Sequence, residues 1–257
     1  MTARRAVGLG VLVTLVVLAL LPHGDPNEVA IARAYAPPGA DHLLGTDQLG
    51  RDLAARMAVG LWRTLLVIAL AGGIGLGLGV LLGLIAGYTG RVVGGAVMSL
   101  ANTVLVIPTF IAALIVSAVF GFGPVSAGIA LGVFGAGPFA NQTCSLVRAV
   151  RTRESIDVER MMGTPATTIL LRHVMPEVAR PVLAYLGSTG AGAAVAYAGL
   201  AFIGLGVDTT VPDWGAMLYE YRVNLFSNPL LLLWPTLGIL LVAICLNSVV
   251  DTGAGRR

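Results

Sequence analysis

The chain has 257 residues, of which 29 are charged (16 basic plus 13 acidic), or 11%. Ordinary soluble domains carry about 25% charged residues. Hydrophobic residues make up 56% of the chain, and the mean hydropathy is +0.88. Because one core cannot hide that much apolar surface, the composition excludes a soluble globular enzyme, a disordered chain and a nucleic-acid-binding protein. We therefore expect the chain to lie in a lipid bilayer.

Uncharged apolar stretches predict six transmembrane helices, since a bilayer needs about 20 apolar residues for each crossing. They cover approximately residues 6–22, 64–88, 95–120, 125–146, 182–206 and 229–250. The turn signal Gly121–Pro124 separates the third stretch from the fourth. Pro108 is expected to kink the third helix, because proline removes a helix hydrogen bond.

The first stretch is open to two interpretations. Arg4 and Arg5 before a short apolar run also fit a signal peptide, with cleavage after Ala36. The separation between that run and Ala36, and the Pro37 that would follow the cut, favour a retained helix.

The arginines predict the orientation. With a cytoplasmic N-terminus, 11 of the 16 arginines fall in cytoplasmic segments and five outside, as the positive-inside rule requires. We expect both termini in the cytoplasm, outer loops at about 23–63 and 207–228, and a cytoplasmic loop at 148–180. The domain division follows: residues 1–63 form a helix plus an extracytoplasmic segment, and residues 64–257 form the main membrane domain.

The second to sixth stretches contain no Asp, Glu, Arg or His. A carrier coupled to protons or sodium usually places such residues at mid-membrane. His23, His42 and His173 lie in loops without a partner at ligand spacing, and Cys144 and Cys245 lie in apolar runs. We therefore expect no metal site and no catalytic residue, and an energy source on a separate partner.

The second and fifth stretches are rich in small residues. The second contains Ala71, Gly72, Gly73, Gly75, Gly77, Gly79, Gly83, Ala86 and Gly87, and the fifth contains the run from Gly187 to Ala194. Small residues let helices approach closely in lipid. The same residues also fit a pore or gate lining.

The cytoplasmic loop is the most informative segment. An amphipathic helix is predicted over about 151–162, and Gly163 is expected to end it. Its charged residues are Glu154, Asp157, Glu159 and Arg160, and its apolar residues are Ile156, Val158, Met161 and Met162.

A second short helix is predicted over 165–172. Thr164 is a suitable N-cap and Pro165 a suitable first residue, and we expect the helix to end before Pro176. Two short helices joined by a glycine would form a rigid knob that fits a groove on another protein. A solvated connector is the alternative.

This loop resembles the EAA loop of binding-protein-dependent ABC importer permeases. The family pattern is Glu-Ala-Ala, three residues, Gly, nine residues and Ile-x-Leu-Pro. It falls on Asp157-Val158-Glu159, Gly163 and Pro176, and the spacing from glycine to proline matches. The chain departs from the pattern at the triplet, at His173 and at Met175. The loop residues that the resemblance assigns to ATPase coupling are Asp157, Glu159, Arg160, Gly163, Thr164, Pro165, Ala166, Thr167 and Pro176.

Further segments resemble one permease of the dipeptide, oligopeptide and nickel subfamily. His42–Asp52 is similar to a signature before the second helix, and Gly199–Val207 and Pro212–Leu218 are similar to the end of the fifth helix and its outer loop. The residues singled out there are Gly45, Thr46, Asp47, Gly50, Arg51 and Asp52 in the first signature, and Pro212, Trp214 and Gly215 in the outer loop. Trp214 also fits an interfacial tryptophan. Asn247 and Asp251 sit where the subfamily ends its last helix. Tyr197 stands where an acidic residue is common.

The resemblance implies an all-α fold of six transmembrane helices, the type I importer permease fold, in a bacterial inner membrane. It implies a homologous second permease, two ATPase subunits and an extracytoplasmic binding protein as partners. ATP and Mg²⁺ would bind to the ATPases, and this chain would bind no cofactor. The implied function is import of di- or oligopeptides by alternating access, with nickel or a metal chelate as the alternative cargo. From the residues alone, a self-contained transporter or channel and a non-transporting subunit stay open.

Overall fold

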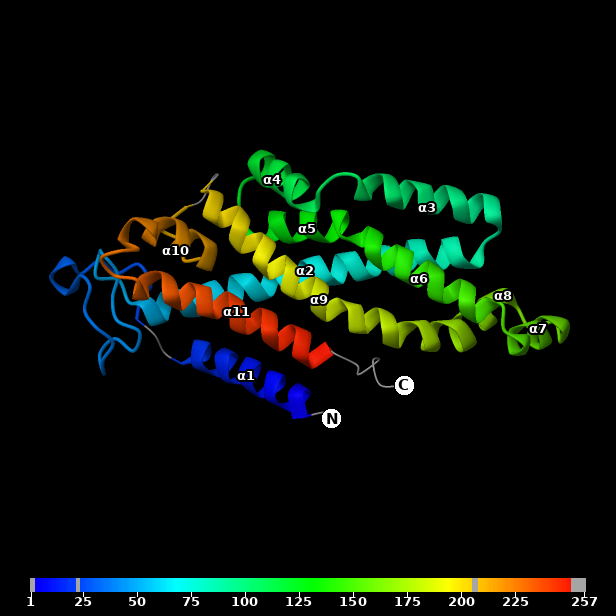
Figure 1. The fold of residues 1–257 in the computed structure, drawn as a ribbon, viewed down its shortest axis with the longest axis horizontal. Helices are drawn as coiled ribbons and strands as arrows, with labels where there is room; N and C mark the ends of the chain where they lie inside the picture. Colours follow the sequence, from blue (N-terminus) through cyan, green and yellow to red (C-terminus); the bar gives the residue numbers. More distant parts are fainter. Residues whose placement is uncertain (1–2, 22–23, 205–207, 251–257) are drawn as a thin grey trace.

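The computed structural model describes residues 3–21, 24–204 and 208–250, and the described chain is mainly helical, apart from an irregular segment over residues 24–52 (Figure 1). In chain order the helices are α1 (Ala3–Leu20), α2 (Leu53–Tyr88), α3 (Arg91–Leu105), α4 (Thr109–Phe120), α5 (Pro124–Phe134), α6 (Ala136–Arg151), α7 (Glu154–Met161), α8 (Ala166–Ile169), α9 (Met175–Ile203), α10 (Trp214–Tyr221) and α11 (Leu230–Val250). Short 3-10 turns lie at Ile31–Arg33 and Arg222–Asn224, and a π turn lies at Leu170–Val174. Within these described ranges, β pairing is limited to one isolated bridge between Thr46 and Asp52.

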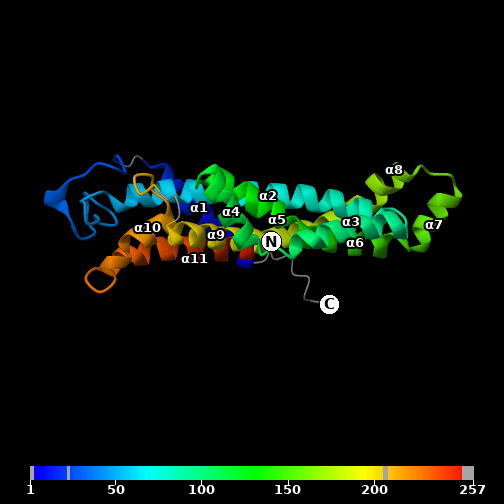
Figure 2. The ribbon, with the colours of Figure 1, turned by 90° about the horizontal axis from the view of Figure 1, so that it is seen from above.

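The helices form an elongated bundle around α2. Helix α2 packs along α5, α6 and α9, and α1 packs along α11. Figures 1 and 2 show the segment from residue 24 to 52 and α10 at one end of the bundle, and α7 and α8 at the other. Two polar ends are therefore separated by a long apolar middle.

Helix α2 begins earlier than the charge pattern predicts. The helix starts at Leu53 rather than at residue 64, because the Asp52 side chain accepts a hydrogen bond from the Ala55 N–H at 2.8 Å and caps it. Its 36 residues span about 54 Å, well beyond the ~30 Å hydrocarbon core. The uncharged stretch that follows Arg63 marks where the helix enters apolar surroundings, and it does not mark where the helix begins. The predicted division at residues 63 and 64 thus falls inside one continuous helix.

Two of the predicted spans are interrupted. Pro108 does more than kink the third, because α3 and α4 meet at a break with a 72° bend. The predicted span 125–146 is divided at Gly135 into α5 and α6. By length and hydropathy three helices could cross a membrane, Leu53–Tyr88, Ala166–Ile203 and Leu230–Val249, and the bent pair makes a fourth when counted as one span. Helix α1 is a shorter apolar helix.

Glycines on one side of α2 bring its backbone against α6. A Cβ added at Gly79 would lie 2.7 Å from the Ala136 carbonyl oxygen and would overlap the Cβ of Phe139. A Cβ at Gly83 would lie 2.6 Å from the carbonyl oxygen of Ala140. The tight-packing interpretation of the small residues is confirmed for this side of the helix. Gly77, in contrast, would place its Cβ in open space.

Three parts of the predicted pattern lie outside the described residues: positions 205–207 of the Gly199–Val207 segment, His23 and Asp251.

We predict that Gly79→Ala destabilises the protein whereas Gly77→Ala does not. The methyl group at position 79 meets backbone atoms that cannot move aside. Such overpacking lowers the free energy of unfolding by about 1–3 kcal/mol. At position 77 the methyl group meets nothing and removes the poor helix propensity of glycine. Unfolding in detergent micelles measures the difference. Equal stability of the two variants would contradict the packing described for α2 and α6.

Candidate functional site

The loop between α6 and α9 forms a knob that is anchored by buried apolar side chains. Ile156 is buried in a cluster with Val150, Ile169 and Val174. The apolar side predicted for the first helix is otherwise not buried, since Met161 and Met162 are 86% and 77% exposed. These two methionines offer an unpartnered apolar surface at the far end of the bundle, where Figures 1 and 2 place α7 and α8.

Gly163 ends α7 as predicted. Its φ is +80°, in the left-handed region that favours glycine. The Gly163 N–H donates to the Arg160 carbonyl at 3.0 Å and the Thr164 N–H donates to the Glu159 carbonyl at 3.1 Å, which is the hydrogen-bond pair of a Schellman motif. The Thr164 hydroxyl donates to the Glu159 carboxylate at 2.7 Å. The predicted N-cap role of Thr164 is therefore wrong, because its hydroxyl closes the preceding helix instead.

The second short helix also differs from the prediction. Pro165 takes the N-cap position, its carbonyl accepting from the N–H groups of Thr168 and Ile169 at 3.0 and 3.1 Å, so that Ala166 and Thr167 open α8. The helix does not end before Pro176. A π turn at Leu170–Val174 joins α8 to α9, and Pro176 lies in the first turn of α9. The π turn shifts the hydrogen-bond register just where proline has no N–H to donate, so the helix continues.

The charged residues of the knob face solvent. Arg160 pairs with Asp157 at 3.0 Å, and both side chains are exposed. Glu159 lies 3.7 Å from His173, and Arg153 pairs with Glu177 of α9. Eight of the nine predicted coupling residues thus lie on the knob, and Pro176 lies in the first turn of α9.

Arg151 joins the knob to the end of α2, a role that its sequence context does not indicate. Its guanidinium donates to the Tyr88 and Thr89 carbonyls at 2.9 and 3.1 Å and lies over the Tyr88 ring at 5.9 Å. A cation at a helix C-terminus satisfies unpaired carbonyls and interacts favourably with the helix dipole. The arginine therefore fixes the base of the knob to the longest helix.

At the opposite end, the first outer signature folds into a buried charge network. Asp47 accepts from Arg51 at 2.6 Å, and Arg51 also pairs with Glu220 of α10. Arg56, 1% exposed, pairs with Glu220 at 3.2 Å. The Tyr221 hydroxyl donates to Asp47 at 3.1 Å. We refer to these five residues, Asp47, Arg51, Arg56, Glu220 and Tyr221, as the outer polar cluster.

The signature's other residues shape the loop around that cluster. Gly45 and Gly50 take positive φ values of +82° and +74°. The Thr46 hydroxyl accepts from the Ala36 N–H at 2.8 Å, and Asp52 accepts from His42 at 2.7 Å.

Burial raises the pKa of Tyr221 further above neutral pH, and its protonated hydroxyl donates to Asp47. Sequence reasoning missed Arg56, Glu220 and Tyr221. The only sequence signal for these members of the cluster was Arg56, which lies one turn after the signature. Glu220 and Tyr221 gave no signal, because they lie far from the signature in the sequence.

The three residues singled out in the second outer loop are buried. Trp214 is 3% exposed, and its indole N–H donates to the Met57 carbonyl at 3.1 Å. A Cβ on Gly215 would meet the carbonyl oxygen of Ala198, and Pro212 is buried as well. Trp214 packs α10 onto α2 in this chain, and the functional role of these three outer-loop residues stays a prediction.

A smaller polar group lies beside α10 at the same end. Arg63 contacts the Asp213 carboxylate at 3.3 Å and donates to the Tyr197 hydroxyl at 3.4 Å. A cavity of about 340 Å³ next to them is lined by Arg63, Asp208 and Asp213 together with Phe122 and Pro124. The carboxylate partner of Arg63 thus comes from the outer loop, while Tyr197 supplies a hydroxyl.

No group of three or more His, Cys, Asp or Glu side chains suited to a metal ion occurs in the described part of the chain. His42 is occupied by its contact with Asp52.

We predict that Glu220→Gln destabilises the outer end far more than Glu177→Gln destabilises the knob. Glu220 pairs with two buried arginines, Arg51 and Arg56. Losing its charge should lower the free energy of unfolding by about 3 kcal/mol, which is the lower end of the range for a broken buried ion pair. The lower end applies because Arg51 still pairs with Asp47. The exposed Arg153–Glu177 pair contributes about 0–1 kcal/mol. Unfolding in detergent, and proteolysis of the segment before α2, measure the two effects. Similar losses in both variants would contradict a cooperative cluster.

Comparison with known proteins supports one family. The family model described as the binding-protein-dependent transport system inner membrane component matches residues 79–255. The glutathione transport system permease protein GsiD of Pectobacterium atrosepticum is 30% identical, over 90% of this chain and 77% of its own length. The dipeptide transport system permease protein DppC of Alkalihalophilus pseudofirmus is 30% identical, over 95% and 82%. The nickel transport system permease protein NikC of Escherichia coli K12 is 30% identical, over 90% and 83%.

The fold agrees with these matches. A solved structure of the MetNI methionine ABC transporter in inward-facing conformations is similar, with a TM-score of 0.57 and 18% identity, over 79% of this chain and 97% of that one. At this identity the likeness concerns the fold alone. The chain is a transport subunit and not an enzyme, and it belongs to the family of inner-membrane permeases of binding-protein-dependent ABC importers.

Proposed function

We propose that the chain is the permease subunit of an ATP-driven peptide importer, working by alternating access with a homologous second permease. Two ATPase subunits would dock beneath it, and an extracytoplasmic binding protein would deliver the cargo. The observation that carries this proposal is the knob. It protrudes beyond the bundle, presents Met161 and Met162 almost fully to solvent, and is fixed to α2 through Arg151.

The knob has the properties of a docking element. Exposed methionines are adaptable apolar contacts, and the neighbouring Asp157–Arg160 pair offers charges of both signs. A short helix held by Ile156 and closed by Gly163 would move as a rigid body when an ATPase pushes on it. ATP hydrolysis on the ATPases, transmitted through the knob, would then drive transport, for which the apolar spans contain no coupling residue.

We infer six membrane crossings with both termini in the cytoplasm. The pairs α3–α4 and α5–α6 would each act as one interrupted crossing beside α1, α2, α9 and α11. The start of α1 and the end of α11 point toward the end of the bundle that carries α7 and α8 (Figure 1), as this orientation requires. The packing of α1 along α11 favours a first helix that is retained.

Di- or oligopeptides are the proposed cargo, with nickel or a metal chelate as the second candidate. Relatives named for dipeptide and glutathione transport support the first, and the NikC relative supports the second. The assembled transporter in proteoliposomes, with its binding protein, separates them: ATP-dependent uptake of labelled dipeptide is expected, without uptake of ⁶³Ni²⁺. If the chain purifies without a second permease and ATPases, the importer proposal fails.

We predict that Gly163→Pro abolishes ATP-driven uptake while the protein still inserts into the membrane. Proline fixes φ near −65° and removes the N–H that donates to Arg160, so the turn at +80° cannot form. Gly163→Asn is the control, because asparagine tolerates the left-handed conformation and the Cβ meets no atom within 4 Å. Normal uptake by the proline variant, at normal abundance, would remove the coupling role from this turn.

A further inference from the structure

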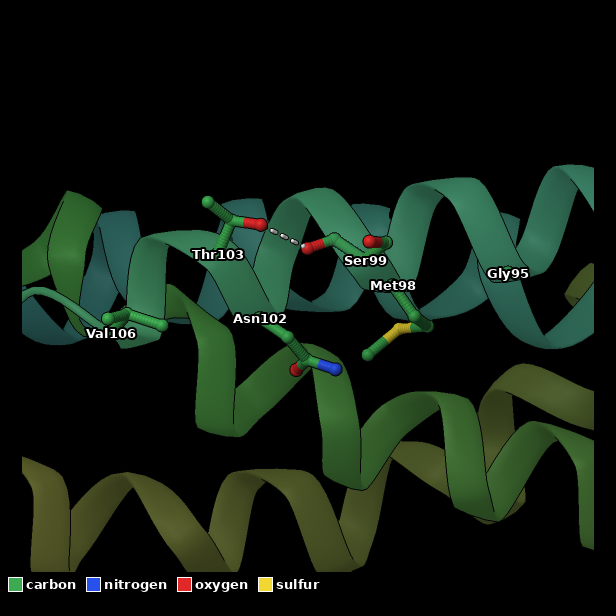
Figure 3. Close-up of a pocket in the computed structure, with 6 residues that line it drawn as sticks. All are labelled: Gly95, Met98, Ser99, Asn102, Thr103 and Val106. Carbon is green, nitrogen blue, oxygen red and sulfur yellow. Dashed lines mark hydrogen bonds between the residues drawn. The ribbon is translucent and has the colours of Figure 1, made fainter.

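A shallow hollow lies on one face of α3, and neutral polar side chains form part of its lining. Six residues line a shallow hollow of about 490 Å³ on this face: Gly95, Met98, Ser99, Asn102, Thr103 and Val106 (Figure 3). Their spacing of three and four residues places them along one side of the helix. We call these six residues the amide face.

The amide face lies at a depth where polar groups need a partner. Asn102 is 11 residues from Arg91 at the start of α3, or about 16 Å along the axis, which is about half of the ~30 Å hydrocarbon core. Its side chain accepts a hydrogen bond from Asn141 of α6 at 2.9 Å, and both residues are exposed. Exposed amides at mid-membrane are unfavourable against lipid, so this face meets either water or protein.

A second observation points to the same conclusion. The amide face ends at Val106, where α3 breaks off and α4 begins at a 72° bend. Val106 is 80% exposed, and the next two residues, Ile107 and Pro108, are exposed as well. Non-helical backbone at membrane depth is tolerated only inside protein or along a water-filled cavity.

The chemistry of the amide face favours water and a moving cargo over a packed protein contact. A Cβ at Gly95 would meet no atom within 4 Å, so nothing in this chain covers the surface at that point. Thr103 donates to the Ser99 carbonyl at 2.9 Å, which satisfies its hydroxyl within the helix. Figure 3 shows Met98 and Asn102 projecting on the same side of α3. Neutral groups of this kind bind weakly, as passage requires.

We propose that the amide face lines the water-filled path through the membrane and that Asn102 and Asn141 pair with main-chain amide groups of a peptide in transit. Asparagine offers both a donor and an acceptor, which matches the N–H and C=O of a peptide bond whatever its side chains are. The proposal rests on the proposed function and adds the position and chemistry of the path.

Cysteine accessibility in the assembled transporter tests this placement. With the buried Cys144 and Cys245 replaced by alanine, single cysteines at Ser99, Asn102 and Leu100 are treated with a charged, water-soluble methanethiosulfonate in proteoliposomes, with and without ATP and vanadate. Leu100 is the matched control, since it is exposed on α3 but lies outside the amide face. Because thiolates form in water, we expect reaction at 99 and 102 at least about tenfold faster than at 100.

Two outcomes would overturn the inference without touching the proposed function. Equal, slow reaction at all three positions in both nucleotide states, in a transporter that still takes up peptide, would place the face against lipid or packed protein. Cross-linking of Asn102→Cys to the second permease would identify it as the interface between the permeases. Loss of ATP-driven uptake in the parent transporter would instead count against the proposed function.

Discussion

The close approach of α2 and α6 is the contact on which the rest of the molecule depends. Between membrane helices the hydrophobic effect gives little, so association rests on close packing of atoms. Glycines at 79 and 83 let the two backbones meet directly. The resulting pair fixes a helix of about 54 Å whose first turns hold the outer polar cluster through Arg56 and whose last turn accepts from Arg151. Both ends of the molecule are therefore tied to one element.

The two ends use charge in opposite ways. In the outer polar cluster Arg51 and Arg56 are buried and share Glu220, which specifies one arrangement of the loop against α10, since an unpaired buried charge is costly. In the knob the Asp157–Arg160 pair and the methionines stay exposed. A buried, fully paired polar end and an exposed end with unpartnered methionines fit the proposed function, in which cargo arrives on one side and an ATPase acts on the other.

Between these ends, the membrane part contains irregular elements where a regular helix would be expected. The break at Pro108 changes the direction of the helix, and Gly135 separates α5 from α6. The break borders the amide face. Such irregular backbone is tolerated inside a membrane only when protein or water surrounds it, which supports the proposed water-filled path along the amide face.

The sequence by itself determined the class of protein, the apolar stretches, the turn at Gly163 and the family, because hydropathy, glycine geometry and motif spacing are local properties. It also indicated that small residues of α2 pack closely, but not which of them, since Gly77 and Gly79 look alike until α6 is placed. Only the tertiary structure decided that Trp214 is buried, that Thr164 closes α7, and that Glu220 and Tyr221 join Arg51 and Asp47. Those contacts link residues up to 174 positions apart, and no local pattern encodes a partner so distant in the chain.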